Sequence, residues 1–383
     1  MRKYVVAHIH EDIKFINDTD RFIGANLINK IIYINDKEQD LSNFNFGVKK
    51  LNKKDRFLIE KLLKELDNPD MIVLYSLSEL SFSLINVLSD KVIIGWRFFG
   101  SELYGKILKD FLTDKTLAVL KKNSPIHIKL KKQVMKFYLN LKRRRRVDDP
   151  TKKIQRIDVF MGLYEEEYNL LKHRFEYLPP AFIKLSIDSA MNNYLPDLNK
   201  KSTIIIGNSR NLWNNHLDIL EYIQENHNSS FKLIVPFNYG EGGNYSKIVR
   251  ESAERIPNTE VLNKFLSADK YDSLYNDVAA LVINSQRQMA VGNILTSLRK
   301  GVKVYLNKKN SYYTYLQKIG FIIFTIDHFK KDYVTGEIQL NNEHRLFNYR
   351  KLRELEENYT KEDFQKEILS FIKNHKGKGN ERF

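Results

Sequence analysis

The sequence predicts an α/β protein made of two Rossmann-like domains. Short β-branched runs, such as MIVLY at residues 71–75, alternate with longer helical patterns, such as DRFLIEKLLKEL at residues 55–66. Such alternation favours parallel sheets that helices cover on both faces. The alternation stops in a proline-containing stretch at residues 177–202 and then restarts, and a length of 383 residues suits two domains.

The order of these patterns defines the predicted domain boundaries. The first domain covers residues 1–195, with strands at residues 4–9, 71–75, 91–95 and 157–162. The second covers residues 196–345, where strands at 203–208, 231–237, 260–262, 280–284, 303–306 and 321–325 alternate with helices at 214–226, 244–256, 269–277 and 292–301. A helical segment at residues 346–383 has no strand after it, so we expect it to pack across a domain surface.

The composition excludes several kinds of chemistry. The chain has no cysteine, so disulfides, thiol catalysis and cysteine-based zinc sites are ruled out. The N-terminus lacks the apolar core of a signal peptide, and no run approaches the ~18 apolar residues of a spanning helix. We therefore expect a cytoplasmic protein that is soluble or bound to a membrane surface.

The net charge of +16 is concentrated in one segment. Residues 106–146 hold ten lysines and four arginines against two aspartates. This excess indicates an anionic partner: a nucleic acid, a phosphorylated small molecule or an anionic membrane. In residues 121–146, apolar side chains at helical spacing are surrounded by basic ones; they are Leu130, Val134, Phe137 and Leu141. The pattern favours a helix lying on an anionic leaflet, although a helix docked on the core has the same spacing.

The loops after the strands are the candidate sites, because such folds bind ligands at the carboxyl ends of parallel strands. The first, at residues 8–16, offers His10 or Asp12 as a general base, or is a solvated loop. The second, GWRFFGSELYG at residues 95–105, gathers aromatic rings and one carboxylate, Glu102. A serine followed by an acid also suits a helix N-terminus, but the aromatic residues then stay unexplained. They favour a wall that stacks on a sugar or a lipid head group.

The later loops suit a phosphate. The third, IIIGNSRN at residues 204–211, places free backbone N–H groups between a strand and a helix. It is not a P-loop, because it lacks the Gly-Lys-Ser/Thr of that motif. The fourth loop, at residues 235–245, lacks the last glycine of the dinucleotide-binding motif, which disfavours NAD binding. The fifth, NSQRQMAVGN at residues 284–293, carries Arg287 ahead of a helix. A guanidinium beside the positive end of a helix dipole makes a pyrophosphate site; otherwise Arg287 is a surface arginine.

At these loops the sequence resembles the 4-acetamido-4,6-dideoxygalactose transferases of glycosyltransferase family 56, which act in enterobacterial common antigen assembly. The family motif W-x-x-[WF]-G-x-[DE]-L-Y is matched by Trp96, Phe99, Gly100, Glu102, Leu103 and Tyr104. Motifs of the second domain are matched by Ile206–Ser209 with His216, by Val235, Pro236 and Tyr239, and by Arg287, Gln288, Val291 and Gly292. Arg97 stands where a histidine is expected.

The resemblance implies a GT-B glycosyltransferase, in which two facing Rossmann-like domains enclose a cleft. It also implies a dTDP-linked deoxyamino sugar as donor and a polyprenyl-diphosphate-linked saccharide as acceptor, at the cytoplasmic face of the bacterial inner membrane. The second domain then binds the donor, through Gly207, Asn208, Ser209, Tyr239, Phe265, Leu266, Arg287, Gln288, Val291, Gly292 and Asn293. The first binds the acceptor, through Trp96, Arg97, Phe99, Gly100 and Tyr104, and the candidate bases are Glu102, Asp12 and His10.

Under this hypothesis Arg287 and the helix dipole stabilise the departing nucleoside diphosphate, and we expect neither a metal nor a cofactor. Three rival hypotheses remain. In the first, the chain is a glycosyltransferase that uses a UDP- or GDP-sugar. In the second, it is an inactive protein of the same fold. In the third, it is a nucleic-acid-binding protein. The last accounts for the charge, but the sequence has no helix-turn-helix or RNP signature.

Overall fold

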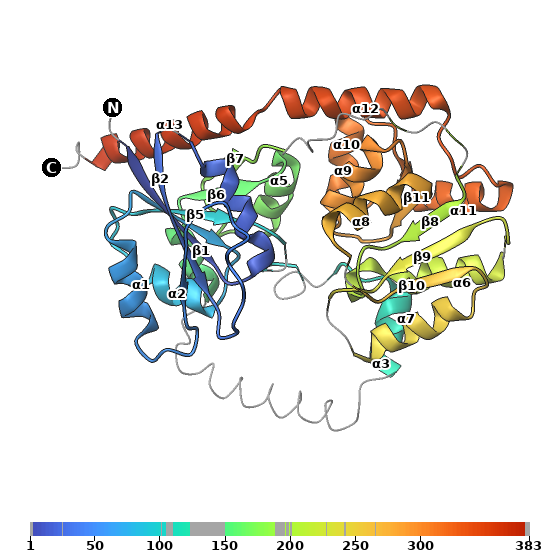
Figure 1. Ribbon diagram of the computed structural model, residues 1–383, viewed down its shortest axis with the longest axis horizontal. Coiled ribbons are helices and arrows are strands. Elements are labelled where there is room, and N and C mark those ends of the chain that lie inside the picture. The colour runs from blue at the N-terminus through green and yellow to red at the C-terminus, as the bar shows by residue number, and fades with distance from the viewer. Residues whose placement is uncertain are drawn as a thin grey trace. The chain divides into compact units, whose positions relative to one another are not determined.

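The computed structural model describes most of the chain. The described residues are 3–24, 26–100, 102–104, 110–122, 150–187, 196, 199, 201–226, 228–240, 243–264 and 266–379. The chain divides into two compact units (Figure 1). Unit 1 comprises Met1–Leu103, Asp148–Ser189 and Glu356–Phe383, and unit 2 comprises Tyr104–Val147 and Ala190–Leu355.

Unit 1 is a Rossmann-like α/β unit. Its described strands form one parallel sheet in the order β3-β2-β1-β4-β5-β6-β7. The order reverses between β1 and β4, where folds of this class bind ligands at the carboxyl ends. The strands are β1 (Tyr4–His10), β2 (Leu27–Ile34), β3 (Val48–Leu51), β4 (Met71–Tyr75), β5 (Ile93–Arg97), β6 (Val159–Gly162) and β7 (Ala181–Lys184). The helices are η1 (Ile13–Phe22), α1 (Leu58–Leu66), α2 (Glu79–Ile85), η2 (Pro150–Arg156), α5 (Glu165–Arg174) and α13 (Lys361–Gly379).

The sequence patterns predict four of these strands and miss β2, β3 and β7. In β2 the polar pair Asn29 and Lys30 interrupts the apolar run. The structure satisfies Asn29 with His8 Nε2, 2.8 Å from its side-chain oxygen, and with the Phe22 carbonyl, 3.1 Å from its side-chain nitrogen. Strand β5 continues to Arg97, two residues beyond its predicted end.

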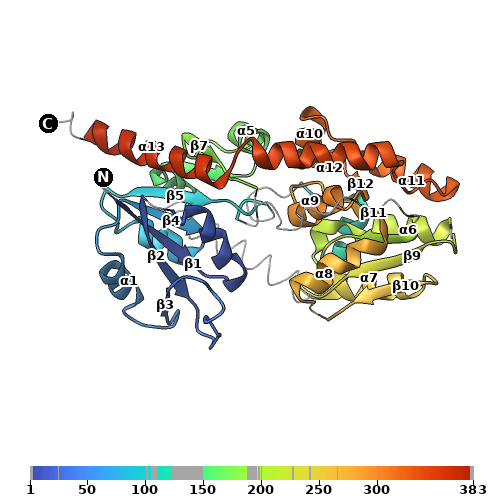
Figure 2. The same cartoon turned by 45° about the horizontal axis from the view of Figure 1, so that its top comes forward.

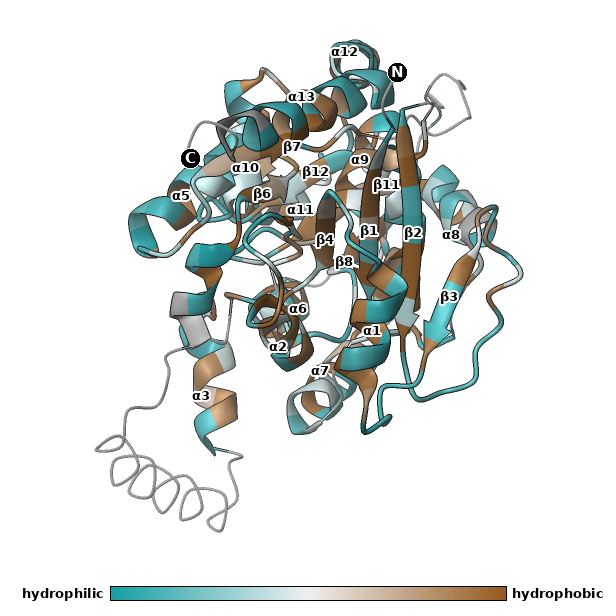
Figure 3. Cartoon of the chain, turned by 90° about the vertical axis from the view of Figure 1, so that its left-hand side faces the viewer, coloured by the Kyte–Doolittle hydropathy of each residue, from teal (hydrophilic) through white to brown (hydrophobic). Residues whose placement is uncertain are grey.

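The core of unit 1 includes the C-terminal helix. All residues of β4 are buried, as expected for a parallel strand covered on both faces, and Figure 3 shows β4 as mostly apolar. Helix α13 contributes Phe364, Ile368 and Ile372 to this core. Their spacing of four puts them on one face of the helix, which lies beside β7 in both Figure 1 and Figure 2.

Unit 2 is a second Rossmann-like unit, with a parallel sheet in the order β10-β9-β8-β11-β12-β13 among its described residues. All six predicted strands are present. They are β8 (Thr203–Ile206), β9 (Lys232–Pro236), β10 (Thr259–Leu262), β11 (Val278–Ile283), β12 (Lys303–Leu306) and β13 (Phe324–Thr325). The helices are α3 (Asp114–Lys122), η3 (Leu212–Asn214), α6 (His216–Glu225), α7 (Asn244–Glu254), α8 (Ala268–Leu274), η4 (Tyr275–Asp277), α9 (Val291–Arg299), α10 (Ser311–Lys318), α11 (Ile326–Thr335) and α12 (Asn342–Glu357).

The structure divides the chain differently from the predicted boundaries. Helix α3, predicted in the first domain, packs Val119 and Leu120 against the core of unit 2. The predicted separate segment 346–383 splits, because α12 holds unit 2 through Asn348, whose side chain bonds both backbone groups of Ile322 at 2.8 and 2.9 Å, whereas α13 belongs to unit 1. A helical pattern reveals an apolar face but not which surface covers it.

The basic segment can be followed only in part. Helix α3 ends at Lys122, and the stripe at 130–141 lies outside the described residues. Within the described part of the chain, no helix combines the length and the apolar composition needed to cross a bilayer.

Candidate functional site

Polar loops meet at the carboxyl edge of the sheet in unit 2. After β8, Gly207 has φ +74°, and a Cβ there would come within 2.5 Å of His216 Nε2. The next residue, Asn208, donates from Nδ2 to the Tyr239 hydroxyl at 2.6 Å, and Arg210 Nε donates to the Gly240 carbonyl at 2.7 Å. The structure therefore joins the predicted donor residues after β8 to those after β9.

Asn293, in the first turn of α9, extends this cluster. Its Nδ2 donates to the hydroxyls of Tyr271 and Tyr275 at 2.6 and 2.9 Å. Neither tyrosine is among the predicted site residues, although their spacing of four in DKYDSLYND puts them on one face of a helix. Leu266 is half-buried just ahead of α8, and Phe265 lies outside the described residues.

Arg287 lies in the loop between β11 and α9 and is only 7% exposed. Its guanidinium carbon is 5.5 Å from the ring centroid of Tyr104 and 5.6 Å from that of Trp213, in η3 after the Gly207 loop. Helix α9 begins at Val291 without a capping side chain, and its first N–H groups have no partner within the helix. The alternative that Arg287 is a surface arginine is therefore wrong. Gln288 is half-buried in the same loop.

A pair of asparagines ties β8 to β11 at the switch point of the sheet. Asn215 Nδ2 donates to the Asn284 carbonyl at 3.1 Å, and Asn284 Nδ2 donates to the Asn215 carbonyl at 3.2 Å. Both side chains are buried. The pair fixes the spacing between the loop of Gly207 and the loop of Arg287, and nothing in the local sequence indicates it.

Two glycines of these loops should respond differently to alanine. We expect Gly207→Ala to lower the melting temperature, because alanine disfavours a positive φ and its Cβ meets His216. Gly292→Ala should leave the melting temperature unchanged or raise it, because a Cβ there has no atom within 4 Å and alanine favours helix. Thermal unfolding followed by circular dichroism compares the two. Equal melting temperatures would contradict the assigned backbone of Gly207.

In unit 1, the aromatic turn at residues 96–104 differs from its prediction. Trp96 is still within β5, is fully buried and packs against Phe98 and Phe160 at ring-centroid distances of 5.3 Å. Trp96 is thus a core residue and does not form part of a stacking wall. Tyr104 also departs from the prediction, because it belongs to unit 2 and lies under Arg287.

Glu102 closes this turn through its carboxylate. Oε1 accepts from the Trp96 indole N–H at 3.2 Å and from the Phe99 backbone N–H at 3.3 Å, and Ser76 also bonds the carboxylate. The side chain is 5% exposed, and burial raises the pKa of its carboxyl above the ordinary value, although these hydrogen bonds partly offset the rise. Gly100, with φ +95°, gives the turn its left-handed residue.

Arg97 is engaged by other residues of unit 1. Its Nε donates to Asp18 Oδ2 at 2.6 Å and its Nη1 to the Phe98 carbonyl at 2.5 Å, while Arg21 binds the other oxygen of Asp18. Burial raises the pKa of Asp18, but the Arg97 and Arg21 guanidiniums outweigh burial and leave it below its ordinary value. The guanidinium carbon of Arg97 is 4.3 Å from the Phe99 ring centroid. Arg97 therefore supports Phe99, which also stacks on Phe15 at 3.8 Å.

We expect Asp18→Asn to lower the free energy of unfolding of unit 1 by roughly 3 kcal/mol, because it leaves two buried guanidiniums without their counter-charge. Urea unfolding in a Trp213→Phe background, where Trp96 is the remaining tryptophan, reports on this unit. The native Asp18 stabilises the fold above its unfolded pKa, and this contribution is lost as pH falls through the lower folded pKa. The variant should therefore lose less stability below about pH 4. Wild-type stability at pH 7 would contradict the assignment.

The other two candidate bases occupy different surroundings. His10 is fully buried, stacks on Tyr75 at 3.7 Å, and places Nε2 at 2.8 Å from the Thr19 hydroxyl. Burial and the neighbouring His8 lower the pKa of His10 to about 3. Asp12 instead caps η1, accepting from the Lys14 backbone N–H at 3.2 Å, and is largely exposed.

The buried histidine predicts a loss of stability in acid. The unfolded chain protonates near the ordinary histidine pKa of 6.5, whereas burial holds the folded pKa of His10 at about 3. The contribution of the neutral His10 ring to the free energy of unfolding is therefore fully present above pH 6.5. It decreases as the pH falls through this window, and about 2 kcal/mol of it is lost at pH 5. In urea unfolding at pH 7.5 and 5.0, His10→Gln should lose less stability than the wild type. The exposed His173→Gln serves as control, and an equal loss in both variants would refute the prediction.

Among the described residues, no group of three or more His, Asp or Glu side chains is arranged to hold a metal ion. The candidate residues instead form one group in unit 2, around Asn208, Tyr239, Asn293 and Arg287, and another in unit 1, around Glu102 and Phe99. Hydrogen-bond donors and a buried cation dominate the first group. Aromatic rings and a buried carboxylate dominate the second.

Comparison with solved structures confirms the fold class. The chain resembles the N-terminal domain of trehalose-6-phosphate phosphatase from Candida albicans, with TM-score 0.66, 10% identity and coverage of 98% of this chain and 97% of that one. It resembles the UDP-forming α,α-trehalose-phosphate synthase of Burkholderia vietnamiensis, with TM-score 0.63, 8% identity and coverage of 97% and 100%. It also resembles a glycosyltransferase of Rickettsia africae ESF-5, with TM-score 0.59, 12% identity and coverage of 98% and 99%. At these identities the likeness establishes the fold alone, which is GT-B.

The sequence itself matches one protein family over residues 132–362, which is more than half of the chain. The family is described as 4-alpha-L-fucosyltransferase, glycosyl transferase group 56. Its members are glycosyltransferases, which use a nucleotide-sugar donor and a saccharide acceptor, so the match decides against the nucleic-acid-binding alternative. The chain belongs to the 4-alpha-L-fucosyltransferase family, glycosyl transferase group 56, and is a GT-B glycosyltransferase.

Proposed function

We propose that this enzyme transfers a deoxyamino sugar resembling 4-acetamido-4,6-dideoxygalactose from a dTDP-sugar to a polyprenyl-diphosphate-linked saccharide. The reaction serves bacterial surface polysaccharide synthesis, of the O-antigen or enterobacterial common antigen kind, at the cytoplasmic face of the inner membrane. The observation that carries the proposal is the buried Arg287, which lies in the loop before the uncapped start of α9 and has its guanidinium carbon 5.6 Å from the ring centroid of Trp213.

Unit 2 binds the donor in this proposal. Arg287 and the first N–H groups of α9 neutralise the diphosphate, since a helix N-terminus carries roughly half a positive charge. Gly292 lies in that first turn, with nothing within 4 Å of an added Cβ, which leaves space for the diphosphate to approach. Asn208 and Tyr239 bind the donor from the opposite loops, and Tyr271 and Tyr275 hold Asn293 in place.

Unit 1 binds the acceptor. The stacked rings of Phe15 and Phe99, supported by Arg97, offer an aromatic surface for a sugar. Glu102 takes the proton of the acceptor hydroxyl, because burial raises the pKa of its carboxyl, as general bases at neutral pH require. Its hydrogen bonds to Trp96 and Phe99 orient the carboxylate in the same turn.

Thermal-shift measurements with dTDP, UDP and GDP test the donor. We expect dTDP to raise the melting temperature most in the wild type, and Arg287→Ala to lose most of this rise. A larger rise in melting temperature with UDP or GDP would mean that the donor carries that nucleotide and not dTDP, while the proposed class of reaction would stand. No rise with any nucleoside diphosphate would overturn the donor site.

Sedimentation with lipid vesicles tests the membrane proposal. The basic residues of 121–146 would bring the enzyme to its lipid-linked acceptor, with about 1 kcal/mol from each lysine or arginine near an anionic surface. The protein should pellet with anionic vesicles and remain in solution with neutral ones. Pelleting that does not depend on lipid charge, or none at all, would refute this proposal.

A further inference from the structure

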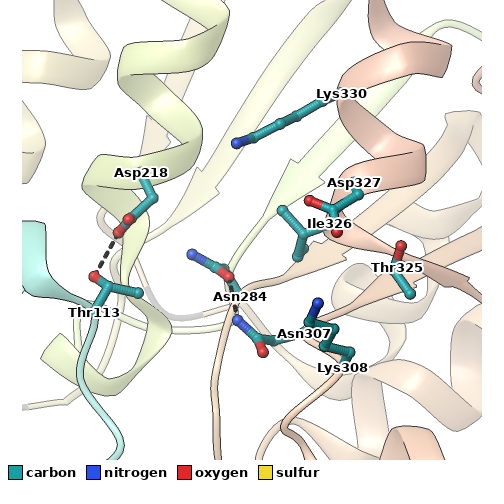
Figure 4. A pocket seen from close by; sticks show the side chains of 9 residues that line it. All are labelled: Thr113, Asp218, Asn284, Asn307, Lys308, Thr325, Ile326, Asp327 and Lys330. Carbon is teal, nitrogen blue, oxygen red and sulfur yellow. Dashed lines mark hydrogen bonds between the residues drawn. The ribbon is translucent and has the colours of Figure 1, made fainter.

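A small cavity in unit 2 is not accounted for by sugar transfer. It has a volume of about 180 Å³ and lies at the ends of β11, β12 and β13, beside the first turns of α6 and α11 (Figure 4). Asn284 and Asn307 form part of its wall and are held together by a hydrogen bond of 2.8 Å. Sites for drug-sized ligands occupy roughly 300–1,000 Å³, so this cavity suits a smaller molecule.

Two lysines give the cavity its chemistry. Both Lys308 and Lys330 line it; in Figure 4 Lys330 extends from α11 over the cavity, and Lys308 lies beside Asn307. Among the described residues, neither ammonium group has a carboxylate within 4 Å, although Lys330 lies 5.3 Å from the Tyr222 ring centroid. Lysine ammonium groups that converge on a cavity are typical of sites for a phosphate or a carboxylate.

The remaining polar lining indicates what else the ligand carries. Asp218 and Asp327 also line the cavity; Asp218 accepts from the Thr113 hydroxyl at 2.7 Å, and Asp327 is exposed at the rim. These carboxylates repel a bare anion but accept hydrogen bonds from hydroxyl groups. We propose that the cavity binds a small anion that also bears hydroxyl groups, such as a phosphomonoester of a polyol.

The cavity is separate from the residues proposed to bind the donor. Asn284 is three residues from Arg287, but the Arg287 guanidinium lies over Tyr104 and Trp213, and none of these three residues lines the cavity. A ligand there would touch the first turns of α6 and α11 and Asn284, one member of the buried asparagine pair that ties β8 to β11. Its lining residues differ from those proposed to bind the nucleotide, so the inference does not rest on the proposed function.

Isothermal titration of the full chain at constant ionic strength tests the proposal, with glycerol 3-phosphate, inorganic phosphate and glycerol as probes. We expect glycerol 3-phosphate to bind more tightly than phosphate, and glycerol not to bind. Lys308→Gln and Lys330→Gln should each weaken glycerol 3-phosphate binding about tenfold, because each removes a charged hydrogen bond. The neighbouring Lys309→Gln and Lys331→Gln, which do not line the cavity, should bind as the wild type does.

The Arg287→Ala variant separates this cavity from the donor site. We expect it to bind glycerol 3-phosphate as the wild type does, while it loses its response to nucleoside diphosphate. Binding lost in Arg287→Ala but kept in both cavity-lysine variants would place the anion at the donor site and overturn the proposal, as would a lack of binding by the wild type. Because Lys308 is exposed, its variant tests the cavity even if Lys330→Gln fails to fold.

Discussion

Arg287→Ala should lower the rate of sugar transfer by at least tenfold, and by as much as roughly 10²–10³-fold, while the protein stays folded. Breaking the bond between sugar and phosphate leaves a dianionic or trianionic nucleoside diphosphate, and charge grows on its oxygens in the transition state. A guanidinium that is already held in a buried position needs little reorganisation when this charge develops. The measurement is single-turnover transfer from the nucleotide sugar, with circular dichroism as a test of folding.

Two further arginine variants make this result specific. Arg287→Lys keeps the charge but loses the planar pair of donors that match a phosphate, so it should recover only part of the rate. Arg255→Ala removes an exposed arginine at the end of α7 and should transfer at the wild-type rate. Unchanged turnover in Arg287→Ala would remove Arg287 from the mechanism, even if the nucleotide still binds.

Glu102→Gln should lower transfer by roughly 10²–10⁴-fold, the usual contribution of a general base, with little change in stability. Glutamine has the same shape, and its side-chain oxygen can still accept from the Trp96 indole and the Phe99 N–H. It cannot take a proton from the acceptor. The acid limb of the kcat/KM profile, set by the raised pKa of this carboxyl, should therefore disappear in the variant.

Glu102→Ala separates catalysis from folding at the same position. Alanine leaves the indole N–H of the fully buried Trp96 without its acceptor, and an unsatisfied buried donor costs about 1–3 kcal/mol. Glu102→Ala should therefore be both inactive and less stable, whereas Glu79→Gln, at the exposed start of α2, should match the wild type. If Glu102→Gln transfers normally and only Glu102→Ala fails, Glu102 merely closes the turn and the base lies elsewhere.

The prediction of this turn went wrong because of a strand boundary. The pattern KVIIG predicts a strand that ends at Gly95, which leaves Trp96 and Arg97 in a loop open to a ligand. Pairing with β4 and β6 instead extends β5 to Arg97 and turns the Trp96 ring into the core. The end of a strand depends on the neighbouring strands, so a local pattern predicts it poorly.

In the same region, distant partners decide what a polar side chain can do. From the sequence, Arg97 is expected to bind the acceptor. In the structure its Nε donates to Asp18, which lies 79 residues earlier in the chain. The two meet because β1 and β5 lie in one parallel sheet and the segments after them share its carboxyl edge.

By itself, the sequence determined the kind and order of most elements and the loops that carry the family motifs. Side-chain period and β-branching are local properties, so they can be read along the chain. Only the tertiary structure decided that Trp96 is buried, that Tyr104 lies under Arg287, that Tyr271 and Tyr275 hold Asn293, and that α13 completes the core of unit 1. Each of these depends on contacts between segments far apart in the chain, which are set by how the sheet orders its strands.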